Sequence, residues 1–227
     1  MSAIKQLFPR QLPKLVMFDL DGTLLDSVPD LAAAVNVMLQ QLGREQVSLE
    51  QVSRWVGNGA LVLVRRALAC DMDYSPISAE QAQPALELFL QAYASEGSRS
   101  QLYPGVIQTL GKLQQAGVKL AIITNKPTQF LPALLEQFAL NDYFDWVVGG
   151  DSVPQQKPEP AGLNWVMQQA GVNAAEALFV GDSKNDIQAA RAAGVACVAM
   201  SYGYNHGQPV AQHAPDLVID EMSQLFA

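Results

Sequence analysis

Two aspartates one residue apart are the first side chains in this sequence that could do chemistry. Asp19 and Asp21 follow the apolar run Leu15-Val16-Met17-Phe18 and precede Gly22-Thr23. In extended backbone, side chains at positions i and i+2 project to the same side about 7 Å apart, so the two carboxylates can flank one reacting group. One carboxylate can attack as a nucleophile while the other transfers a proton.

Further polar residues follow other apolar runs. Thr124 and Asn125 follow Leu120–Ile123, Lys157 stands after Trp146–Val148, and the segment Gly181-Asp182-Ser183-Lys184-Asn185-Asp186 follows Leu178–Val180. Carboxylates gathered around a phosphate repel it, because unit charges 4 Å apart at an effective dielectric of 20 cost roughly 4 kcal/mol per pair. A cation is therefore required. The donors are hard oxygens and the chain has only 2 histidines, which favours Mg²⁺ over zinc.

Each of these residues also has a simpler interpretation. Asp182 or Ser183 can cap the following helix, and Asp186 can favour its positive N-terminus, roles that are compatible with metal binding. Thr124 can end its strand with a turn hydrogen bond, and Lys157 taken alone is typical of a solvated surface lysine. The whole set, rather than any one member, indicates a catalytic site.

Short apolar runs alternate along the chain with helical patterns that end at glycines. This alternation predicts an α/β fold, a Rossmann-like parallel sheet with ligands bound beyond the carboxyl ends of its strands. The predicted helices are Pro104–Ala116, Pro160–Ala170 and Ser183–Ala193. The predicted strands are Leu15–Phe18, Leu120–Ile123, Trp146–Val148, Leu178–Val180 and Ala196–Ala199.

The stretch from 27 to 100 breaks this alternation because it contains helical patterns only. We interpret it as an all-helical cap domain, with its exit at Gly97-Ser98, inserted into a core made of residues 15–26 and 101–227. Residues 1–14 form an N-terminal extension with no assigned role. The predicted cap helices are Leu31–Leu42, Leu49–Trp55, Ala60–Leu68 and Ala79–Ser95.

Composition excludes several classes of protein. With 49% hydrophobic and 16% charged residues in 227, the chain is predicted to fold without disulfide staples, and a net charge of −8 argues against a nucleic-acid partner. Cys70 and Cys197 match neither a redox pair nor a zinc site. We find neither a secretory signal nor a run long enough to cross a membrane, so we expect a cytoplasmic protein without a membrane partner. The sequence is compatible with a monomer and with a homodimer.

The four polar segments stand in an order that identifies a family. Asp19-Leu20-Asp21-Gly22-Thr23-Leu24, Thr124-Asn125, Lys157-Pro158 and Gly181 to Asp186 together resemble the four signature motifs of the haloacid dehalogenase superfamily. The helical insert resembles that superfamily's mobile cap. The resemblance implies that Asp19 attacks phosphorus and becomes an aspartyl phosphate. Asp21 would protonate the leaving alkoxide and then activate the hydrolytic water.

The same resemblance implies the roles of the remaining motif residues. Mg²⁺ would bind the Asp19 carboxylate, the Asp21 backbone carbonyl and Asp182, with Asp186 in support. Thr124, Asn125 and Lys157 would hold the transferring oxygens, where charge spreads in the transition state.

Two more segments resemble those of bacterial phosphoglycolate phosphatases. They are Trp55-Val56-Gly57-Asn58-Gly59-Ala60 in the insert and Tyr202-Gly203-Tyr204-Asn205-His206-Gly207 near the end. Gly57, Asn58 and Gly59 would bring backbone amides to a small anion, with Arg65 and Arg66 close behind. From the residues alone, Gly57 can equally end one helix while Asn58 caps the next. A lone loop histidine such as His206 is more typical of a solvated residue than of a catalyst.

The resemblance therefore predicts a Mg²⁺-dependent phosphatase acting on 2-phosphoglycolate. A substrate this small requires a lid, which segments 22–27 and 97–104 would hinge. A sugar-phosphate phosphatase or phosphomutase of the same superfamily stays open. A phospho-receiver signalling domain also combines Asp, Thr and Lys around Mg²⁺, but its chain is about half as long. A non-catalytic nucleotide-binding module would need a GxGxxG segment that this sequence lacks.

Overall fold

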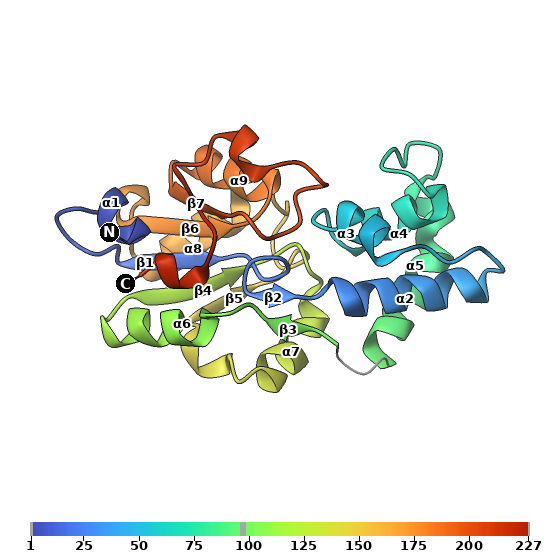
Figure 1. Cartoon of the computed structure of the whole chain (residues 1–227), viewed down its shortest axis with the longest axis horizontal. Helices are drawn as coiled ribbons and strands as arrows, with labels where there is room; N and C mark the ends of the chain where they lie inside the picture. Colours follow the sequence, from blue (N-terminus) through green and yellow to red (C-terminus); the bar gives the residue numbers. More distant parts are fainter. Residues whose placement is uncertain (1, 96–98, 227) are drawn as a thin grey trace.

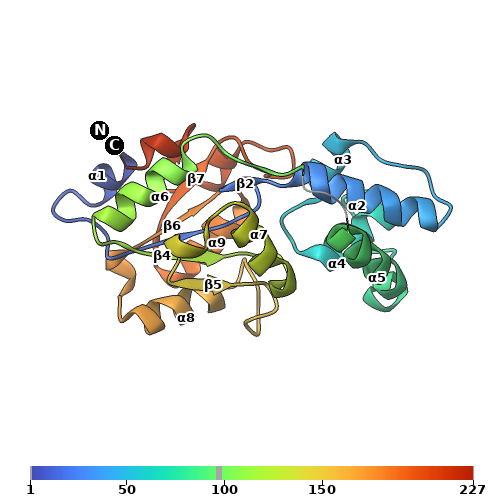
Figure 2. The same ribbon diagram turned by 90° about the horizontal axis from the view of Figure 1, so that it is seen from below.

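The computed structural model describes residues 2–95 and 99–226, and shows an α/β lobe and a helical lobe side by side (Figure 1). Both termini lie on the α/β lobe, at the end far from the helical lobe (Figures 1 and 2). The strands are β1 Leu15–Phe18, β2 Leu25–Asp26, β3 Gln101–Leu102, β4 Lys119–Ile123, β5 Trp146–Val148, β6 Ala177–Gly181, β7 Ala196–Met200 and β8 Leu217–Ile219. The α-helices are α1 Ala3–Leu7, α2 Val28–Gln41, α3 Leu49–Trp55, α4 Ala60–Ala69, α5 Ala79–Ser95, α6 Val106–Gln115, α7 Leu131–Gln137, α8 Ala161–Ala170 and α9 Lys184–Ala193.

A six-stranded parallel sheet in the order β5-β4-β1-β6-β7-β8 forms the middle of the α/β lobe. Strand β1 shows why its sequence is apolar throughout, because successive side chains alternate between the two faces. Val16 and Phe18 pack with α6 and α7 on one face, while Leu15 and Met17 pack with α8 and α9 on the other. The polar residues that follow β1, β4 and β6 are thus brought to one edge.

The helical lobe has a core of its own. The apolar faces of α2, α3, α4 and α5 bury Val35, Phe89 and their neighbours in one cluster, which also includes Tyr204 from the loop after β7. Helix α3 begins with a capping box, in which Gln51 N donates to Ser48 Oγ at 3.2 Å and Ser48 N donates to Gln51 Oε1 at 2.9 Å. We call this lobe, residues 28–95, the cap.

Two chain segments join the cap to the α/β lobe, and they pair with one another. Strands β2 and β3 are antiparallel, with Leu25 opposite Leu102 and Asp26 opposite Gln101. The Asp30 carboxylate accepts hydrogen bonds from the backbone N–H groups of Arg99 and Ser100, at 2.6 and 3.0 Å. Gly97 and Ser98, the predicted exit of the insert, lie outside the described residues.

The predicted α/β class is confirmed, and the structure adds one strand to the large sheet, the short pair β2 and β3, and two helices. Strand β8, three residues at the sheet edge, was not among the five predicted strands, and neither α1 nor α7 was predicted. Ala3 and Ile4 of α1 are buried in the same cluster as Val16 and Phe18, so part of segment 1–14 belongs to the core.

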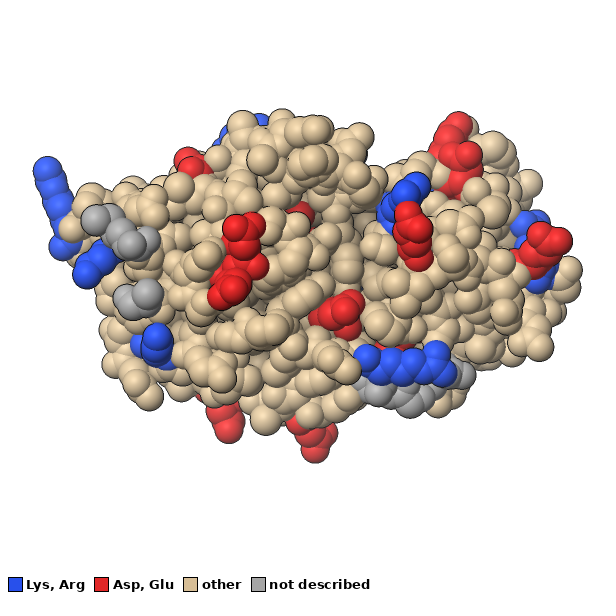
Figure 3. Space-filling view, in the orientation of Figure 1, with Lys and Arg blue, Asp and Glu red and all other residues tan. Residues whose placement is uncertain are grey.

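Two observations concern the surface. None of the helices in residues 2–95 and 99–226 combines the length and apolar character needed to cross a membrane. On the face drawn in Figure 3, Lys and Arg side chains are scattered rather than gathered in one patch. That face offers no continuous basic surface to a polyanion.

Candidate active site

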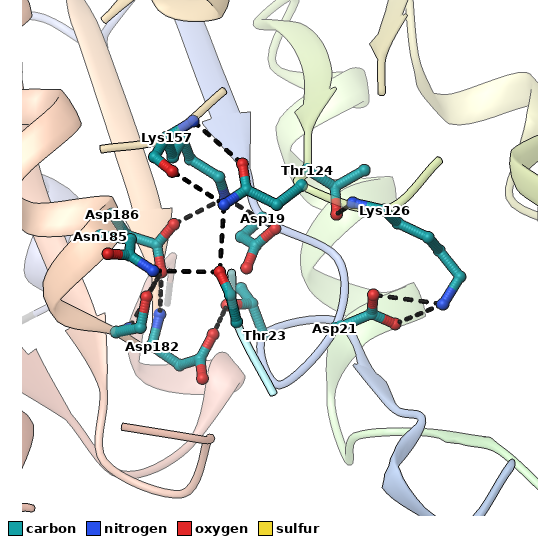
Figure 4. A network of polar contacts seen from close by, with 12 residues as sticks. Asp19, Asp21, Thr23, Thr124, Lys126, Lys157, Asp182, Asn185 and Asp186 are labelled. Carbon is teal, nitrogen blue, oxygen red and sulfur yellow. Dashed lines mark hydrogen bonds and ion pairs between the residues drawn. The ribbon is translucent and has the colours of Figure 1, made fainter. Parts of the chain in front are cut away.

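The predicted motif residues gather at the carboxyl edge of the sheet (Figure 4). Asp19 directly follows β1, and its backbone N–H donates to Val180 O on β6 at 2.9 Å. Thr124 and Asn125 follow β4, while Asp182 and Asp186 follow β6 at the start of α9. Parallel strands deliver these residues to one place because their carboxyl ends share an edge.

Lys157 joins two of the carboxylates. Its Nζ lies 2.7 Å from Asp19 Oδ1 and 2.7 Å from Asp186 Oδ1. The other Asp186 oxygen accepts from Ser183 N at 2.9 Å and from Ser183 Oγ at 2.7 Å, which completes a capping box on α9. The lysine is 4% exposed, so it is a buried cation among carboxylates rather than a solvated surface residue.

Asp182 is held by groups from two segments, one after β1 and one after β7. Thr23 Oγ1 donates to Asp182 Oδ1 at 2.9 Å, and Tyr204 N donates to Asp182 Oδ2. Gly22 and Gly203 pack directly against this carboxylate, and a Cβ at either position would overlap it. Gly22 also has a φ of 91°, which side chains other than glycine rarely adopt. Both glycines are therefore needed where they stand.

The electrostatics of this cluster fit a divalent cation. Ligand atoms of Asp19, Asp182 and Asp186 lie within 4.8 Å of one another. Burial, opposed by Lys157 and reinforced by Asp186, raises the pKa of Asp19 to about 7. Burial and the neighbouring carboxylates raise the pKa of Asp182 well above its usual range. Asp19 Oδ1 is buried, and the ammonium of Lys157 lies 2.7 Å from it. Hard carboxylate oxygens short of positive charge are the donor set that Mg²⁺ prefers.

Asp21 has a different partner, a lysine that was not predicted. Lys126 Nζ lies 3.1 and 3.2 Å from the two Asp21 carboxylate oxygens. Lys126 is 5% exposed, and the Tyr93 ring from α5 covers it at 4.7 Å from its centroid. Burial alone lowers the pKa of Lys126, but Asp21 more than offsets this and holds the pKa above its ordinary value. The signal in the sequence is that Lys126 stands two residues after Thr124, at the same strand end.

A cavity of about 50 Å³ separates these residues from the cap, which leaves space for only a few water-sized molecules. Its core side combines acidic, polar and basic groups, and its cap side is apolar except for the Tyr93 hydroxyl and the backbone around Gly57 and Gly59. The core residues are Asp19, Asp21, Thr124, Asn125, Lys126, Pro127 and Phe130. The cap residues are Leu31, Val56, Gly57, Gly59, Ala60, Leu63, Phe89 and Tyr93.

Side-chain amides from the core hold the cap loop that contains Gly57. Asn125 Nδ2 and Asn185 Nδ2 each donate to Gly57 O at 3.0 Å, and Gln156 Nε2 donates to Asn58 O at 3.0 Å. Asn125 also pairs with the Lys157 backbone, at 2.9 and 3.0 Å. We call these contacts on Gly57 and Asn58 the amide clamp.

His206 makes a further contact between the core and the cap. Its Nδ1 lies 2.7 Å from Arg54 O, and its Nε2 is buried without a partner among the described residues. Burial lowers the pKa of His206, as do the nearby charges of Arg66, Lys184 and His213, against the opposing hydrogen bond to Arg54.

The predicted cap residues divide into two groups. Gly57 and Gly59 line the cavity, and Gly59 precedes α4 without a side-chain cap. Arg65 lies outside the cavity lining, with its guanidinium bonded to the carbonyl groups of Tyr74 and Ile77. Asn58 is turned toward Arg66, whose Nη1 lies 3.1 Å from Asn58 Oδ1. The structure therefore does not bring Arg65 and Asn58 together with the motif residues.

A family model described as haloacid dehalogenase-like hydrolase matches residues 16–200. The chain belongs to this family. Over 226 residues, all of this chain and 83% of the relative, the hydrolase is 58% identical to a phosphoglycolate phosphatase of Pseudomonas savastanoi pv. phaseolicola. It is 54% identical over the same extent to phosphoglycolate phosphatase 1 of Pseudomonas aeruginosa. The crystal structure of a predicted phosphoglycolate phosphatase from Haemophilus somnus superposes with a TM-score of 0.87 at 39% identity, covering 93% of this chain and 96% of that one.

Proposed function

We propose that this hydrolase is a magnesium-dependent phosphatase that converts 2-phosphoglycolate and water into glycolate and phosphate. The observation that carries the proposal is the pair Asp19 and Asp21 in a cavity of about 50 Å³ between the core and the cap. A cavity of that size suits a small phosphomonoester. The full-length relatives named phosphoglycolate phosphatase support the same substrate.

The metal would be held by the acidic cluster. Asp19 and Asp182 would bind it through carboxylate oxygens and Asp21 through its backbone carbonyl, with Asp186 in support. When bound, Mg²⁺ supplies positive charge against the oxygens of the transferring phosphoryl group.

Asp19 and Asp21 divide the reaction into two displacements. An Asp19 carboxylate oxygen forms a bond to phosphorus while the phosphorus–oxygen bond to glycolate breaks, and the leaving oxygen takes a proton from Asp21. Water then attacks phosphorus, Asp21 takes a proton from that water, and the bond to Asp19 breaks. Each cycle returns Asp21 to its protonated form and Asp19 to a free carboxylate.

The other motif residues hold the phosphoryl group and its nucleophile. Lys157, at 2.7 Å from both Asp19 and Asp186, keeps the nucleophile in place and adds positive charge. Thr124 and Asn125 line the cavity; Thr124 would donate to the transferring oxygens, and Asn125 would do so by releasing Gly57 O or Lys157 O. In the cap, Gly57 and Gly59 would offer backbone amides, whereas Asn58 and Arg65 would have to leave their present partners to reach a substrate.

The test is phosphate release by wild type, Asp19→Asn and Asp21→Asn, with Mg²⁺ or a chelator, against a panel of small phosphomonoesters. We expect turnover of 2-phosphoglycolate by wild type with Mg²⁺ only, and none by either variant. Asp145→Asn is the matched control, because Asp145 lies at the opposite end of the sheet and accepts from Leu120 N at 3.0 Å. It should keep full turnover.

Each alternative predicts a different outcome. If wild type prefers a sugar phosphate, the assigned substrate is wrong and the proposed two-step mechanism stands. A stable phosphorylated protein without steady turnover would favour a receiver domain. Normal phosphate release by Asp19→Asn would overturn the mechanism.

A further inference from the structure

The active-site cavity has one basic side chain in its described lining, and no motif assigns it a role. That side chain is Lys126. Lys157 lies behind Asp19 and does not line the cavity, while Arg65 and Arg66 of the cap bond to backbone carbonyl groups elsewhere. A substrate with a second anionic group would therefore meet Lys126 as the available cation in this lining.

Lys126 is buried and reaches one anion in the structure. Its ammonium contacts both carboxylate oxygens of Asp21, and the Tyr93 ring closes the side toward the cap. A buried ammonium requires an anionic partner, because an unpaired buried charge is strongly destabilising. An ammonium has three N–H donors, so it can hold Asp21 and a second carboxylate together.

The connectivity of the substrate places its carboxylate beside this lysine. In 2-phosphoglycolate one methylene separates the carboxylate from the oxygen that leaves phosphorus, and Asp21 must reach that oxygen to protonate it. A group in contact with Asp21 therefore adjoins the carboxylate as well. Across the cavity, Leu31, Val56, Leu63 and Phe89 offer no charge to pair with it.

We propose that Lys126 binds the carboxylate of the leaving group and so selects 2-phosphoglycolate over neutral phosphate esters. This proposal rests on the proposed function. The N-terminus of α4, with Gly59 and Ala60 at the cavity, would add backbone donors on the opposite side. Lys126 would then act as a specificity-determining residue, distinct from the groups that transfer the phosphoryl group.

The competing interpretation is that Lys126 only positions Asp21. The two interpretations differ in how they depend on substrate, because a misplaced Asp21 slows every ester, whereas a lost carboxylate contact slows only esters that carry one. The experiment measures kcat/KM of wild type and Lys126→Met for 2-phosphoglycolate and for 2-hydroxyethyl phosphate, which replaces the carboxylate by a neutral CH2OH group.

We expect kcat/KM of Lys126→Met for 2-phosphoglycolate to fall roughly ten- to hundredfold, the usual effect of losing a hydrogen bond to a charged group. For 2-hydroxyethyl phosphate, kcat/KM of Lys126→Met should differ from that of wild type by less than about threefold. Turnover of this ester by the variant also shows that the variant is folded. Lys126→Arg should recover part of the selectivity. Lys119→Met is the matched control, since Lys119 lies at the other end of β4 and bonds to Ala170 O.

Equal losses for both esters would overturn the assignment and leave Lys126 as a positioning residue. An unchanged kcat/KM for 2-phosphoglycolate would overturn it too. Failure of the proposed function is a separate result, seen in wild type as a lack of 2-phosphoglycolate turnover.

Discussion

The amide clamp gives a prediction about how the cap closes. The cap forms one side of the active-site cavity of about 50 Å³, so we expect it to open for substrate entry and product release and to close in each cycle. Asn185 contributes one clamp bond, from its Nδ2 to Gly57 O at 3.0 Å. Asn185→Ala removes this bond and leaves the neighbouring Asp186 unchanged.

The size of the effect follows from the remaining contacts. Gly57 O still accepts from Asn125, so the substitution leaves no buried carbonyl without a donor. The loss is then the net contribution of one neutral hydrogen bond, about 0.5–1.5 kcal/mol, or a two- to tenfold change in the closing equilibrium. Because the bond exists only with the cap closed, KM should rise by about that factor while kcat stays within about twofold.

The assay is steady-state phosphate release with Mg²⁺, together with hydrogen exchange of segment 56–59 with and without inorganic phosphate. Asn36→Ala is the matched control, because Asn36 makes two amide bonds to Val47 within the cap, at 2.8 and 3.0 Å. It should lower the melting temperature without raising KM. A KM for Asn185→Ala equal to that of wild type, with unchanged exchange, would refute the role of the clamp.

Two further predictions concern pH and packing. Because the pKa of half-buried His206 is depressed below 6.5, its contribution to cap closure is present above that value and lost as pH falls through the folded-state pKa. KM of wild type should therefore rise on acidification, and His206→Gln should flatten the profile; the same slope in both proteins would contradict this. Gly203→Ala forces a methyl group into Asp182, so we expect a loss of about 1–3 kcal/mol of stability and weaker Mg²⁺ binding by calorimetry. Gly111→Ala, in α6 with open space around it, should instead gain about 0.5–1 kcal/mol, and equal effects of the two substitutions would show that the contact with Asp182 is not what matters.

The sheet was predictable where apolar runs are long and central. Leu15–Phe18 lies between two parallel neighbours with both faces covered, so its sequence carries no polar residue and the strand is unmistakable. Strand β8 pairs on one side only, is three residues long and leaves Val218 exposed, which removes that signal. Helix α7 begins with Leu131-Pro132 and has seven residues, too few to show the hydrophobic periodicity of an amphipathic helix.

The site was predictable at its motifs and less so around them. The order of four polar segments indicated which strand ends would meet, because topology alone brings them to one edge. Which lysine faces the cavity depends on the direction of side chains in a loop, so Lys126 was not predicted as a site residue. Arg65 stands near Gly59 in sequence, but its guanidinium bonds to the carbonyl groups of Tyr74 and Ile77, acceptors that sequence alone does not reveal.

The paired strands β2 and β3 restrict the geometry of cap motion. If the two segments joining the lobes were unpaired linkers, the cap could rotate about several axes. Hydrogen-bonded to each other, and joined by Asp30 to residues 99 and 100, they form a single ribbon that bends easily across its flat face and resists bending in its plane. Successive closures should therefore follow one arc, which returns Gly57 to the same amides in every turnover.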